Sequence, residues 1–296
     1  MSDVYIVEAQ DATYFLKVYR NDRSSKENIE AEVSFLNDLF DNQVSVATPV
    51  MNCRSSYLNE LSTPEGTRYA VLFHAVTGGE PEEDNLDQSR KFGKLAGRIH
   101  NCADGLNKQY KRGHLDEKYL VKNPIIYMEP YLHNRKRDLD YLSKFGSDLI
   151  AELNGLLSRE TPEYGICHGD LHAGNARYNT NGELTLFDFD SFGYGWRVVD
   201  IGVYLVSYDW MDLSREGKSK KDRFWNAFVE GYNQQRALNK NELTAVQLCL
   251  PIRHFELMGI TIRYWSQNIG ISWIDDDYFD RHISWFKKWS SEYREY

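Results

Sequence analysis

The chain has 296 residues, of which 42% are hydrophobic and 27% charged, and its formal net charge is −9. A chain of this length exceeds the usual size of one hydrophobic core, so we expect two lobes or one large domain. The negative charge disfavours a general nucleic-acid binder and suits a protein that tolerates cationic substrates.

The cysteines and the hydropathy pattern indicate where the protein acts. The four cysteines are far apart and form no C-x-x-C pair, which favours reduced thiols over a zinc site or a disulfide framework. The sequence has no apolar run of about eighteen residues, and its start lacks the basic and apolar regions of a signal peptide. We therefore expect a cytoplasmic protein without membrane spans.

The first third of the chain predicts strands and one helix. Apolar runs and alternation, separated by polar turns, predict strands at residues 4–7, 14–19, 44–52 and 69–76. Between the last two of these strands, the segment around Pro64 is expected to be turn-rich. A helix is predicted over residues 26–40 by a stripe of apolar side chains: Ile29, Val33, Leu36 and Phe40.

The rest of the chain is mostly helical in pattern. Helices are predicted at residues 86–102, 138–157, 199–210, 221–236, 241–267 and 278–293. Two short strands, 175–178 and 184–188, flank Asn181-Gly182, which is a good hairpin turn. The strand at 69–76 ends before a glycine pair, Gly78-Gly79, which we interpret as a hinge between lobes.

Residues 166–190 carry the strongest functional signal. They hold Asp170, Asn175 and Asp188 in an order that suits phosphoryl transfer. Asp170 is the candidate that steers an acceptor hydroxyl and takes its proton late in the transfer. Asn175 and Asp188 offer one amide and one carboxylate oxygen, a plausible protein shell for Mg²⁺, which prefers few protein oxygens together with phosphate and water.

Other polar residues nearby are expected to support this loop. His168 is predicted to act by hydrogen bonding and packing, and the role of His172 is left open. Asp190 either contacts a metal or hydrogen-bonds the following loop, and we favour the second role. Asp200 opens a helix and suits an N-cap or a buried brace. Upstream, Lys17 lies in a predicted strand and would pair with Glu30 or Glu32 of the next helix.

The segments HGDLHAGN and LFDFDSFGYGWRVVDIG resemble the aminoglycoside phosphotransferase and choline kinase superfamily, in particular its homoserine-kinase-type and stress-response-kinase branch. The resemblance implies an α+β, bilobal, protein-kinase-like fold with a small β-rich N-terminal lobe and a larger, mainly helical C-terminal lobe. We expect a nucleotide-binding lobe at residues 1–76 and a catalytic and substrate lobe at 77–296. ATP and Mg²⁺ are the implied cofactors.

The resemblance also assigns roles to residues. It makes Asp170 the catalytic base, Asn175 and Asp188 the metal ligands, and Lys17 the phosphate-binding lysine. Glu32 is the preferred partner of Lys17, because the pattern E-x-x-F-L matches related chains. The backbone at His74 to Val76 would bind adenine.

One feature departs from the family pattern. Family members begin with a strand and a glycine-containing loop that covers the phosphates, whereas no glycine precedes Gly66 here. We therefore expect that the first strand and the Gly-rich loop are lacking.

The acceptor is less well defined by the sequence. We expect a small hydroxyl compound, with no nucleic acid or membrane partner; the alternatives are a stress-response-type protein Ser/Thr kinase and a nucleotide-binding pseudokinase. Asp209, Asp212 and residues 275–277 could hold a cationic amine, but the last run more readily caps the helix that follows it.

Overall fold

The computed structural model describes residues 2–10, 12–21, 24–64, 66–82, 85–207, 211–265 and 273–293. The chain forms two compact units. Unit 1 comprises Met1–Gly113, Ile166–Gly193 and Asn226–Ala237, and unit 2 comprises His114–Gly165, Tyr194–Trp225 and Leu238–Tyr296. Residues 166–190 thus lie in the same unit as the N-terminal strands. The predicted lobe boundary after residue 76 stays a prediction.

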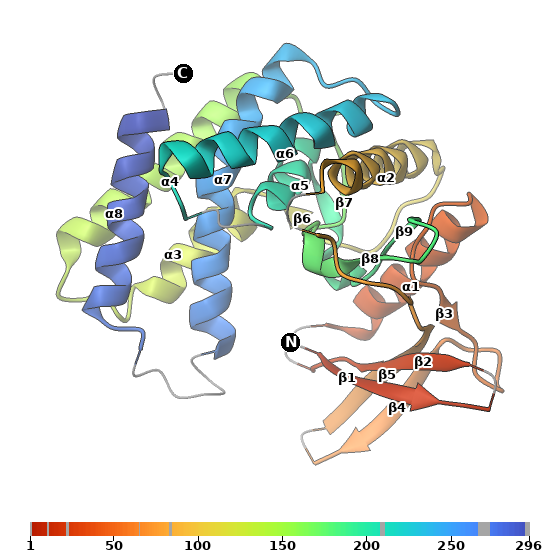
Figure 1. The fold of residues 1–296 in the computed structure, drawn as a ribbon. Helices are drawn as coiled ribbons and strands as arrows, with labels where there is room; N and C mark the ends of the chain where they lie inside the picture. Colours follow the sequence, from red (N-terminus) through yellow and green to blue (C-terminus); the bar gives the residue numbers. More distant parts are fainter. Residues whose placement is uncertain are drawn as a thin grey trace. The chain divides into compact units, whose positions relative to one another are not determined.

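A five-stranded antiparallel sheet and one long helix build the N-terminal part of unit 1 (Figure 1). The strands are β1 (Asp3–Glu8), β2 (Thr13–Val18), β3 (Pro49–Val50), β4 (Leu58–Thr63) and β5 (Gly66–His74). Their order is β1-β2-β5-β3, and β4 also pairs with β5; all of these pairings are antiparallel. The register places Lys17 opposite Val71 at the centre of the sheet.

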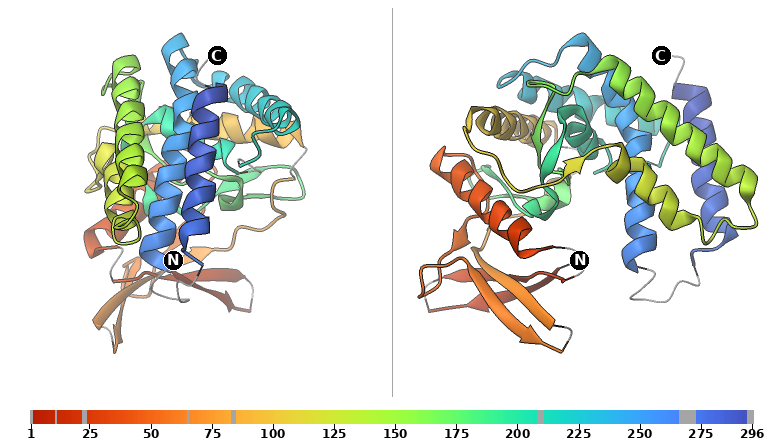
Figure 2. Two further views of the ribbon diagram at one scale, coloured as in Figure 1. Left: turned by 90° about the vertical axis from the view of Figure 1, so that its left-hand side faces the viewer. Right: turned by 180° about the vertical axis from the view of Figure 1, so that it is seen from behind.

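Helix α1 (Lys26–Asp41) packs beside this sheet (Figure 2, right). The Ser25 hydroxyl caps it by accepting a hydrogen bond from Asn28 N at 3.3 Å. Ile29, Val33 and Leu36 are buried as the apolar stripe predicts, whereas Phe40 is 57% exposed. The helix is therefore confirmed, with Leu39 in place of Phe40 at the end of its buried face.

The sheet differs from the sequence prediction in two places. Pro64 lies in the turn between β4 and β5, as predicted, but the polar stretch before it contains β4, whose sequence LNELST has no apolar run that would signal a strand. The strand predicted at residues 44–52 is reduced to β3 and a bridge between Val46 and Leu186. Pro49 has no N–H to donate, which limits how far such a ladder can extend.

Unit 1 also contains α2 (Leu86–Gly105), β8 (Ala176–Tyr178) and β9 (Leu184–Leu186). β8 and β9 form the predicted hairpin, with Gly182 at a φ of 72° in its turn. On α2, Phe92, Ala96 and Ile99 are buried, and His100 Nδ1 lies 2.7 Å from Tyr232 Oη. His100 is thus a packing residue of α2.

Unit 2 is built on helices, with α4, α7 and α8 side by side (Figure 2, left). Its helices are α3 (Asn123–Met128), α4 (Lys136–Leu156), α5 (Arg197–Leu205), α7 (Lys240–Ile260) and α8 (Asp276–Tyr293). α6 (Arg215–Asn233) begins in unit 2 and ends in unit 1. Helix α7 is buried on most sides, which explains why its pattern is apolar almost all round. β6 (His114–Leu115), β7 (Tyr164–Cys167) and β10 (Gly193–Trp196) complete the described strands, and β10 pairs in parallel with β6.

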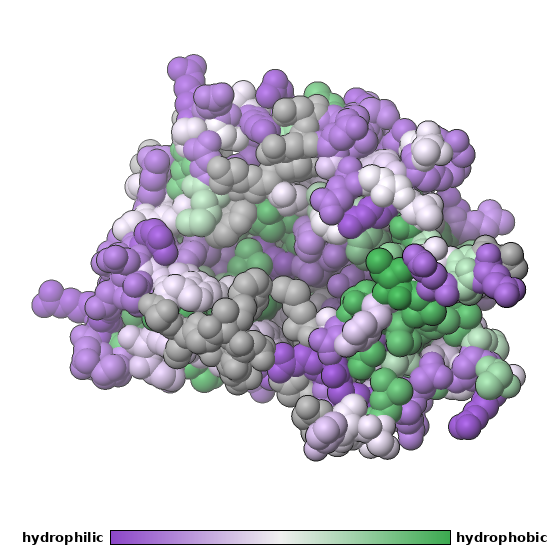
Figure 3. All heavy atoms as spheres, turned by 60° about the horizontal axis from the view of Figure 1, so that its bottom comes forward, coloured by the Kyte–Doolittle hydropathy of each residue, from purple (hydrophilic) through white to green (hydrophobic). Residues whose placement is uncertain are grey.

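The surface is largely hydrophilic on the face shown in Figure 3, with hydrophobic residues gathered toward one side of it. The exposed large apolar side chains include Val4, Tyr5 and Ile6 of β1, which in the described part of the chain pairs with β2 alone. Within the described residues, no helix combines the length and apolarity needed to cross a membrane. All four cysteines are free.

Candidate active site

Lys17 lies at the centre of a group of three carboxylates in unit 1. Its Nζ is 2.5 Å from Asp188 Oδ1, 3.3 Å from Asp190 Oδ2 and 3.6 Å from Glu32 Oε1. Lys17 and Glu32 are buried, whereas the Asp188 side chain is 41% exposed. The lysine therefore joins strand β2 to helix α1 and to the segment after β9.

The charges in this group shift each other's protonation. Burial alone would lower the pKa of Lys17, but Asp190, Glu32 and Asp188 outweigh burial and raise that pKa well above its ordinary value. Burial raises the pKa of Glu32 to about 7, against the opposing attraction of Lys17. Tyr19 adds a hydrogen bond, because its hydroxyl donates to Glu32 Oε2 at 3.1 Å. Lys17 is thus charged throughout the physiological range.

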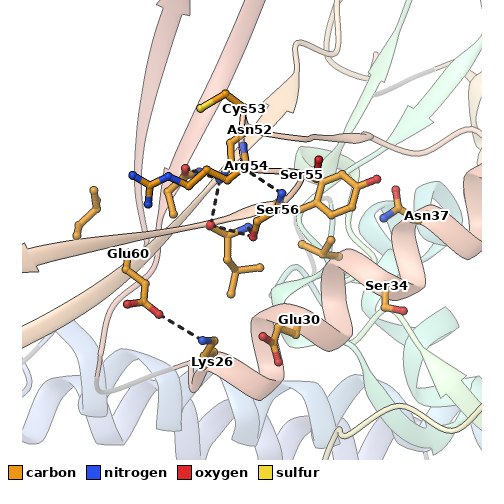
Figure 4. Close-up of a pocket in the computed structure, with 15 residues that line it drawn as sticks. Lys26, Glu30, Ser34, Asn37, Asn52, Cys53, Arg54, Ser55, Ser56 and Glu60 are labelled. Atoms are coloured by element: carbon orange, nitrogen blue, oxygen red, sulfur yellow. Dashed lines mark hydrogen bonds and ion pairs between the residues drawn. The ribbon is translucent and has the colours of Figure 1, made fainter.

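Glu30, the alternative partner of Lys17, lies on the other side of α1. Residues two apart on an α-helix point about 200° away from each other. Glu30 lines a pocket of about 920 Å³ between α1 and residues 52–61, together with Ser34 and Asn37 (Figure 4). An ion pair at 3.2 Å between Lys26 and Glu60 lies beside it. The structure therefore brings Glu32, not Glu30, to Lys17.

The catalytic loop is held in place by His168. This side chain is fully buried, and its ring centroid lies 4.2 Å from that of Phe189. Asp170 N donates to His168 Nδ1 at 3.3 Å, so His168 carries its proton on Nε2, which lies 3.1 Å from the carbonyl oxygen of Phe187. His168 thus links the loop to the strand end before Asp188, as a structural support.

Gly169 permits this arrangement for two reasons. Its φ is 80°, in the left-handed region that favours glycine. A Cβ at this position would lie 2.2 Å from the carbonyl oxygen of Ser191. The loop and the segment after β9 can pack this closely because position 169 has no side chain.

Asp170 and Asn175 are directly connected. Asn175 Nδ2 donates to the Asp170 carbonyl oxygen at 2.9 Å and to Asp170 Oδ2 at 3.3 Å. This assignment of the amide turns Asn175 Oδ1 away from those contacts and makes it available as a ligand. The turn of residues 173–175 ends at the start of β8, so the hairpin fixes where Asn175 lies.

Asp188 comes to the same region from the other strand of the hairpin. Phe187 N donates to the Asn175 carbonyl oxygen at 3.0 Å, and Asp188 follows immediately. Asp188 has a φ of 64°, a left-handed conformation that aspartate tolerates better than most residues. An amide oxygen and a partly exposed carboxylate are hard oxygen donors, so these two residues fit Mg²⁺. Among the described residues, no group of three or more His, Cys, Asp and Glu side chains could enclose a metal.

Asp190 and Arg112 brace the segment after β9. Asp190 contacts Lys17 and accepts a hydrogen bond from the Ser191 hydroxyl at 3.2 Å. Arg112 donates to the carbonyl oxygens of Phe192 at 2.6 Å, of Asp190 at 2.5 Å and of Asn28 at 3.4 Å. Its guanidinium also lies 4.5 Å from the Phe192 ring centroid. Arg112 thus ties helix α1 to the segment that carries the carboxylates.

The hinge segment offers fewer backbone groups to adenine than the sequence suggested. His74 N already donates to Thr48 O at 3.0 Å, and Ala75 N to Thr13 O at 3.2 Å. Among residues 74–76, the Val76 N–H and the backbone carbonyl oxygens are therefore the groups that could hydrogen-bond adenine. Gly78, with a φ of 130°, passes so close to β8 that a Cβ would lie 2.1 Å from Tyr178 O.

Three further candidates in unit 2 are Asp200, Asp212 and Asp275. Asp200 is buried in the first turn of α5, whose N-cap is Trp196, so Asp200 is not the N-cap; its role as a brace stays a prediction. Asp275 Oδ1 accepts a hydrogen bond from Tyr278 N at 2.9 Å, so this acidic run caps α8. Asp212 holds a turn by accepting from Ser214 N at 2.8 Å. Asp209 lies outside the described residues.

Sequence reasoning missed Arg112 and the contribution of Tyr19. Arg112 lies in a segment without periodic pattern, and its contacts are 78 to 84 residues away, so no local signal marks it. The sequence did contain a signal for Tyr19, because side chains two residues apart on a strand point to the same face and Tyr19 therefore lies on the face of Lys17.

The profile of the phosphotransferase enzyme family matches residues 2–238. An uncharacterized protein of Synechocystis sp. is 31% identical over 292 residues, covering 97% of this chain and 76% of that protein. The structure of amicoumacin kinase in complex with AMP-PNP, Ca²⁺ and Ami matches with a TM-score of 0.81 at 24% identity, over 97% of this chain and 84% of that one. A microcompartment-associated aminopropanol kinase matches with a TM-score of 0.77 at 22% identity, over 96% and 86% of the two chains.

At these identities the structural matches show the fold alone. They confirm the predicted α+β, protein-kinase-like architecture with an N-terminal sheet and a helical C-terminal region. The match to the family covers well over half of the chain and includes residues 166–190. This chain therefore belongs to the phosphotransferase enzyme family and is a kinase with an alcohol group as acceptor.

Proposed function

We propose that this protein transfers the γ-phosphate of ATP, with Mg²⁺, to a hydroxyl group of a small molecule. The observation that carries the proposal is the Lys17 cluster, in which a buried lysine contacts Glu32 and Asp188 in the same unit as Asp170. Phosphoryl transfer needs positioning and charge neutralisation more than covalent chemistry, and this cluster supplies both.

The residues divide the work as follows. Lys17 binds the α- and β-phosphates and is oriented by Glu32. Mg²⁺ held by Asn175 and Asp188 would neutralise charge on the phosphates. Asp170 orients the acceptor hydroxyl and takes its proton as the oxygen bonds to the γ-phosphorus. The bond between that phosphorus and the β,γ-bridging oxygen breaks at the same time, and ADP leaves.

A small acceptor is supported by the neighbours in structure, which include an amicoumacin kinase and an aminopropanol kinase. The net charge of −9 is compatible with an acceptor that carries an amine. We therefore expect an amino alcohol or an amine-bearing natural product rather than an anionic substrate.

The test is a phosphate-transfer screen with labelled ATP and Mg²⁺. The acceptor panel contains aminopropanol, choline, ethanolamine, homoserine, aminoglycosides and amicoumacin, with a protein mixture as a separate arm. Labelled product should appear with a small amine-bearing acceptor and disappear in Asp170→Asn. If label appeared only on protein, the proposal of a small-molecule acceptor would be wrong and the acceptor would be a protein.

The pseudokinase alternative makes a different prediction. If the wild-type protein binds ATP but transfers phosphate to no acceptor in either arm, the proposed function is wrong. Calorimetric titration with the non-hydrolysable analogue AMP-PNP and Mg²⁺ measures nucleotide binding without turnover. Asp170→Asn should retain this binding, because Asp170 serves the acceptor and not the nucleotide.

A further inference from the structure

His172 contacts the catalytic carboxylate from within the catalytic loop. Its Nε2 lies 3.5 Å from Asp170 Oδ2, the same oxygen that accepts from Asn175 Nδ2 at 3.3 Å. The side chains of His172 and Asp170 are 34% and 28% exposed, so both remain accessible to a reacting molecule. Neither the family match nor the phosphoryl-transfer chemistry above assigns a role to this histidine.

The other ring nitrogen of His172 fixes its tautomer. Gly174 N donates to His172 Nδ1 at 3.0 Å, which makes Nδ1 an acceptor. A neutral imidazole with an accepting Nδ1 carries its proton on Nε2. The nitrogen that faces Asp170 Oδ2 is therefore an N–H donor.

The local backbone is built around this ring. His172 caps the turn of residues 173–175, and Asn175 N donates to the His172 carbonyl oxygen at 3.0 Å. Gly174 leaves room for the imidazole, since a Cβ there would lie 2.7 Å from His172 Cε1 and 2.8 Å from Nδ1. An alanine at position 174 would displace the imidazole, so the observed position of the His172 ring depends on glycine at 174.

We propose that His172 is a positioning residue for Asp170. Its Nε2–H and the Asn175 amide both reach Oδ2, so together they fix the rotation of the carboxylate and the direction in which Oδ1 points. A distance of 3.5 Å is long for a hydrogen bond, and such contacts commonly shorten when substrate closes the site. This inference rests on the proposed role of Asp170 as the group that orients the acceptor hydroxyl.

Two isosteric substitutions separate positioning from loop capping. In His172→Asn the side-chain oxygen takes the place of Nδ1 and keeps the hydrogen bond from Gly174 N, but no donor from position 172 reaches Asp170, which keeps only the contact from Asn175. In His172→Gln the amide nitrogen takes the place of Nε2 and keeps the donor to Asp170, but the cap is lost. Melting temperature and circular dichroism establish that each variant is folded.

The first measurement needs no identified acceptor. In protein labelled with ¹⁵N-histidine, the His172 resonances are identified by their loss in His172→Asn. We expect the Nε2–H tautomer, with Nε2 shifted when Asp170 is replaced by Asn. The Nδ1–H tautomer, or an Nε2 signal that does not respond to Asp170→Asn, would overturn the proposal.

The second measurement uses the acceptor that the screen identifies, in single-turnover experiments at saturating Mg²⁺ and ATP. His172→Asn should slow the transfer step by about tenfold or more, while His172→Gln stays close to the wild-type rate. Steady-state kinetics with varied ATP should give an unchanged KM for ATP in His172→Asn. Wild-type transfer in His172→Asn, with a loss in His172→Gln, would reduce His172 to a loop cap. If Asp170→Asn itself kept the wild-type rate, the proposed function would fail first.

Discussion

The nearest partner of Lys17 is Asp188, whose Oδ1 lies 2.5 Å from the lysine Nζ. The lysine expected to hold phosphate and the carboxylate expected to hold Mg²⁺ therefore contact each other directly. Glu32 and Asp190 complete the group at 3.6 and 3.3 Å. These four side chains form a pre-organised set of charges, and replacing each one should have a different effect on activity and stability.

Replacing Lys17 by Met should lower kcat/KM for ATP by about a hundredfold, because the cation that meets the phosphates is lost. The free energy of unfolding should fall by about 3–5 kcal/mol, since the largely buried carboxylates of Glu32 and Asp190 lose their counter-charge. Steady-state kinetics and urea unfolding measure the two effects. Lys26→Met is the control, because Lys26 pairs with Glu60 at the surface; unchanged kinetics in Lys17→Met would remove the lysine from the phosphate site.

Replacing Glu32 by Gln should lower kcat/KM for ATP without lowering stability at pH 8. The pKa of Glu32 is about 7 in the folded protein and 4.5 in its reference state, so the folded state binds the extra proton between these values. This contribution to stability is fully present below pH 4.5 and is lost as the pH rises through 7. It amounts to about 3 kcal/mol.

Glutamine removes that titration and still offers an oxygen to Tyr19. In Glu32→Gln, the free energy of unfolding of the ligand-free protein should therefore depend less steeply on pH between 4.5 and 7 than in the wild type. Glu30→Gln is the matched control on the opposite face of α1 and should change neither the kinetics nor the slope. Equal kinetic losses in both variants would contradict the assignment of Glu32 to Lys17.

Replacing Arg112 by Met should reduce activity although the side chain is outside the Lys17 cluster. Three carbonyl oxygens lose their donor, including those of Asp190 and Phe192, so the segment after β9 loses its anchor to α1. We expect a loss of about 2 kcal/mol in the free energy of unfolding and a raised KM for Mg²⁺. Arg98→Met removes a single bond to a carbonyl oxygen at 3.3 Å in the same unit and should leave the KM for Mg²⁺ unchanged.

Acid should destabilise unit 2 through a pair of histidines in contact, of which His254 is buried and His282 is half-buried. His254 Nε2 and His282 Nδ1 lie 2.6 Å apart between α7 and α8. Burial lowers the pKa of His254 well below its ordinary value, and burial together with the charge of Arg281 lowers that of His282 from 6.5 to about 4. The unfolded chain binds more protons in this window, so stability falls as the pH drops from 6.5 toward 4.

His282→Gln should abolish about 2–3 kcal/mol of this acid dependence. Ile283→Val, which removes one buried methyl group from the same helix, should cost about 1 kcal/mol equally at pH 5 and pH 8. Denaturant unfolding at the two pH values separates the variants. An identical pH slope in the wild type and His282→Gln would show that the pair does not stay neutral in the folded protein.

The sequence by itself determined the long helices, one hairpin and the spacing of the candidate catalytic residues. Apolar spacing predicted α1, α2, α4, α7, α8 and the β8–β9 hairpin, because helix and strand periods are local properties of the chain. The spacing of Asp170, Asn175 and Asp188 pointed to phosphoryl transfer for the same reason. The sequence did not predict β4, because this strand has a weakly apolar pattern and is stabilised by its pairing with β5.

The tertiary structure decided which side chains meet. Glu30 and Glu32 are the same residue type with the same helix propensity. Only the packing of α1 on the sheet directs Glu32 to Lys17. The contacts of Arg112 depend on segments far apart in the chain that come together in space. The contacts of His172 with Asp170 and Gly174 depend on how a single turn folds back. Long-range contacts and side-chain direction are set by packing, which local sequence patterns do not encode.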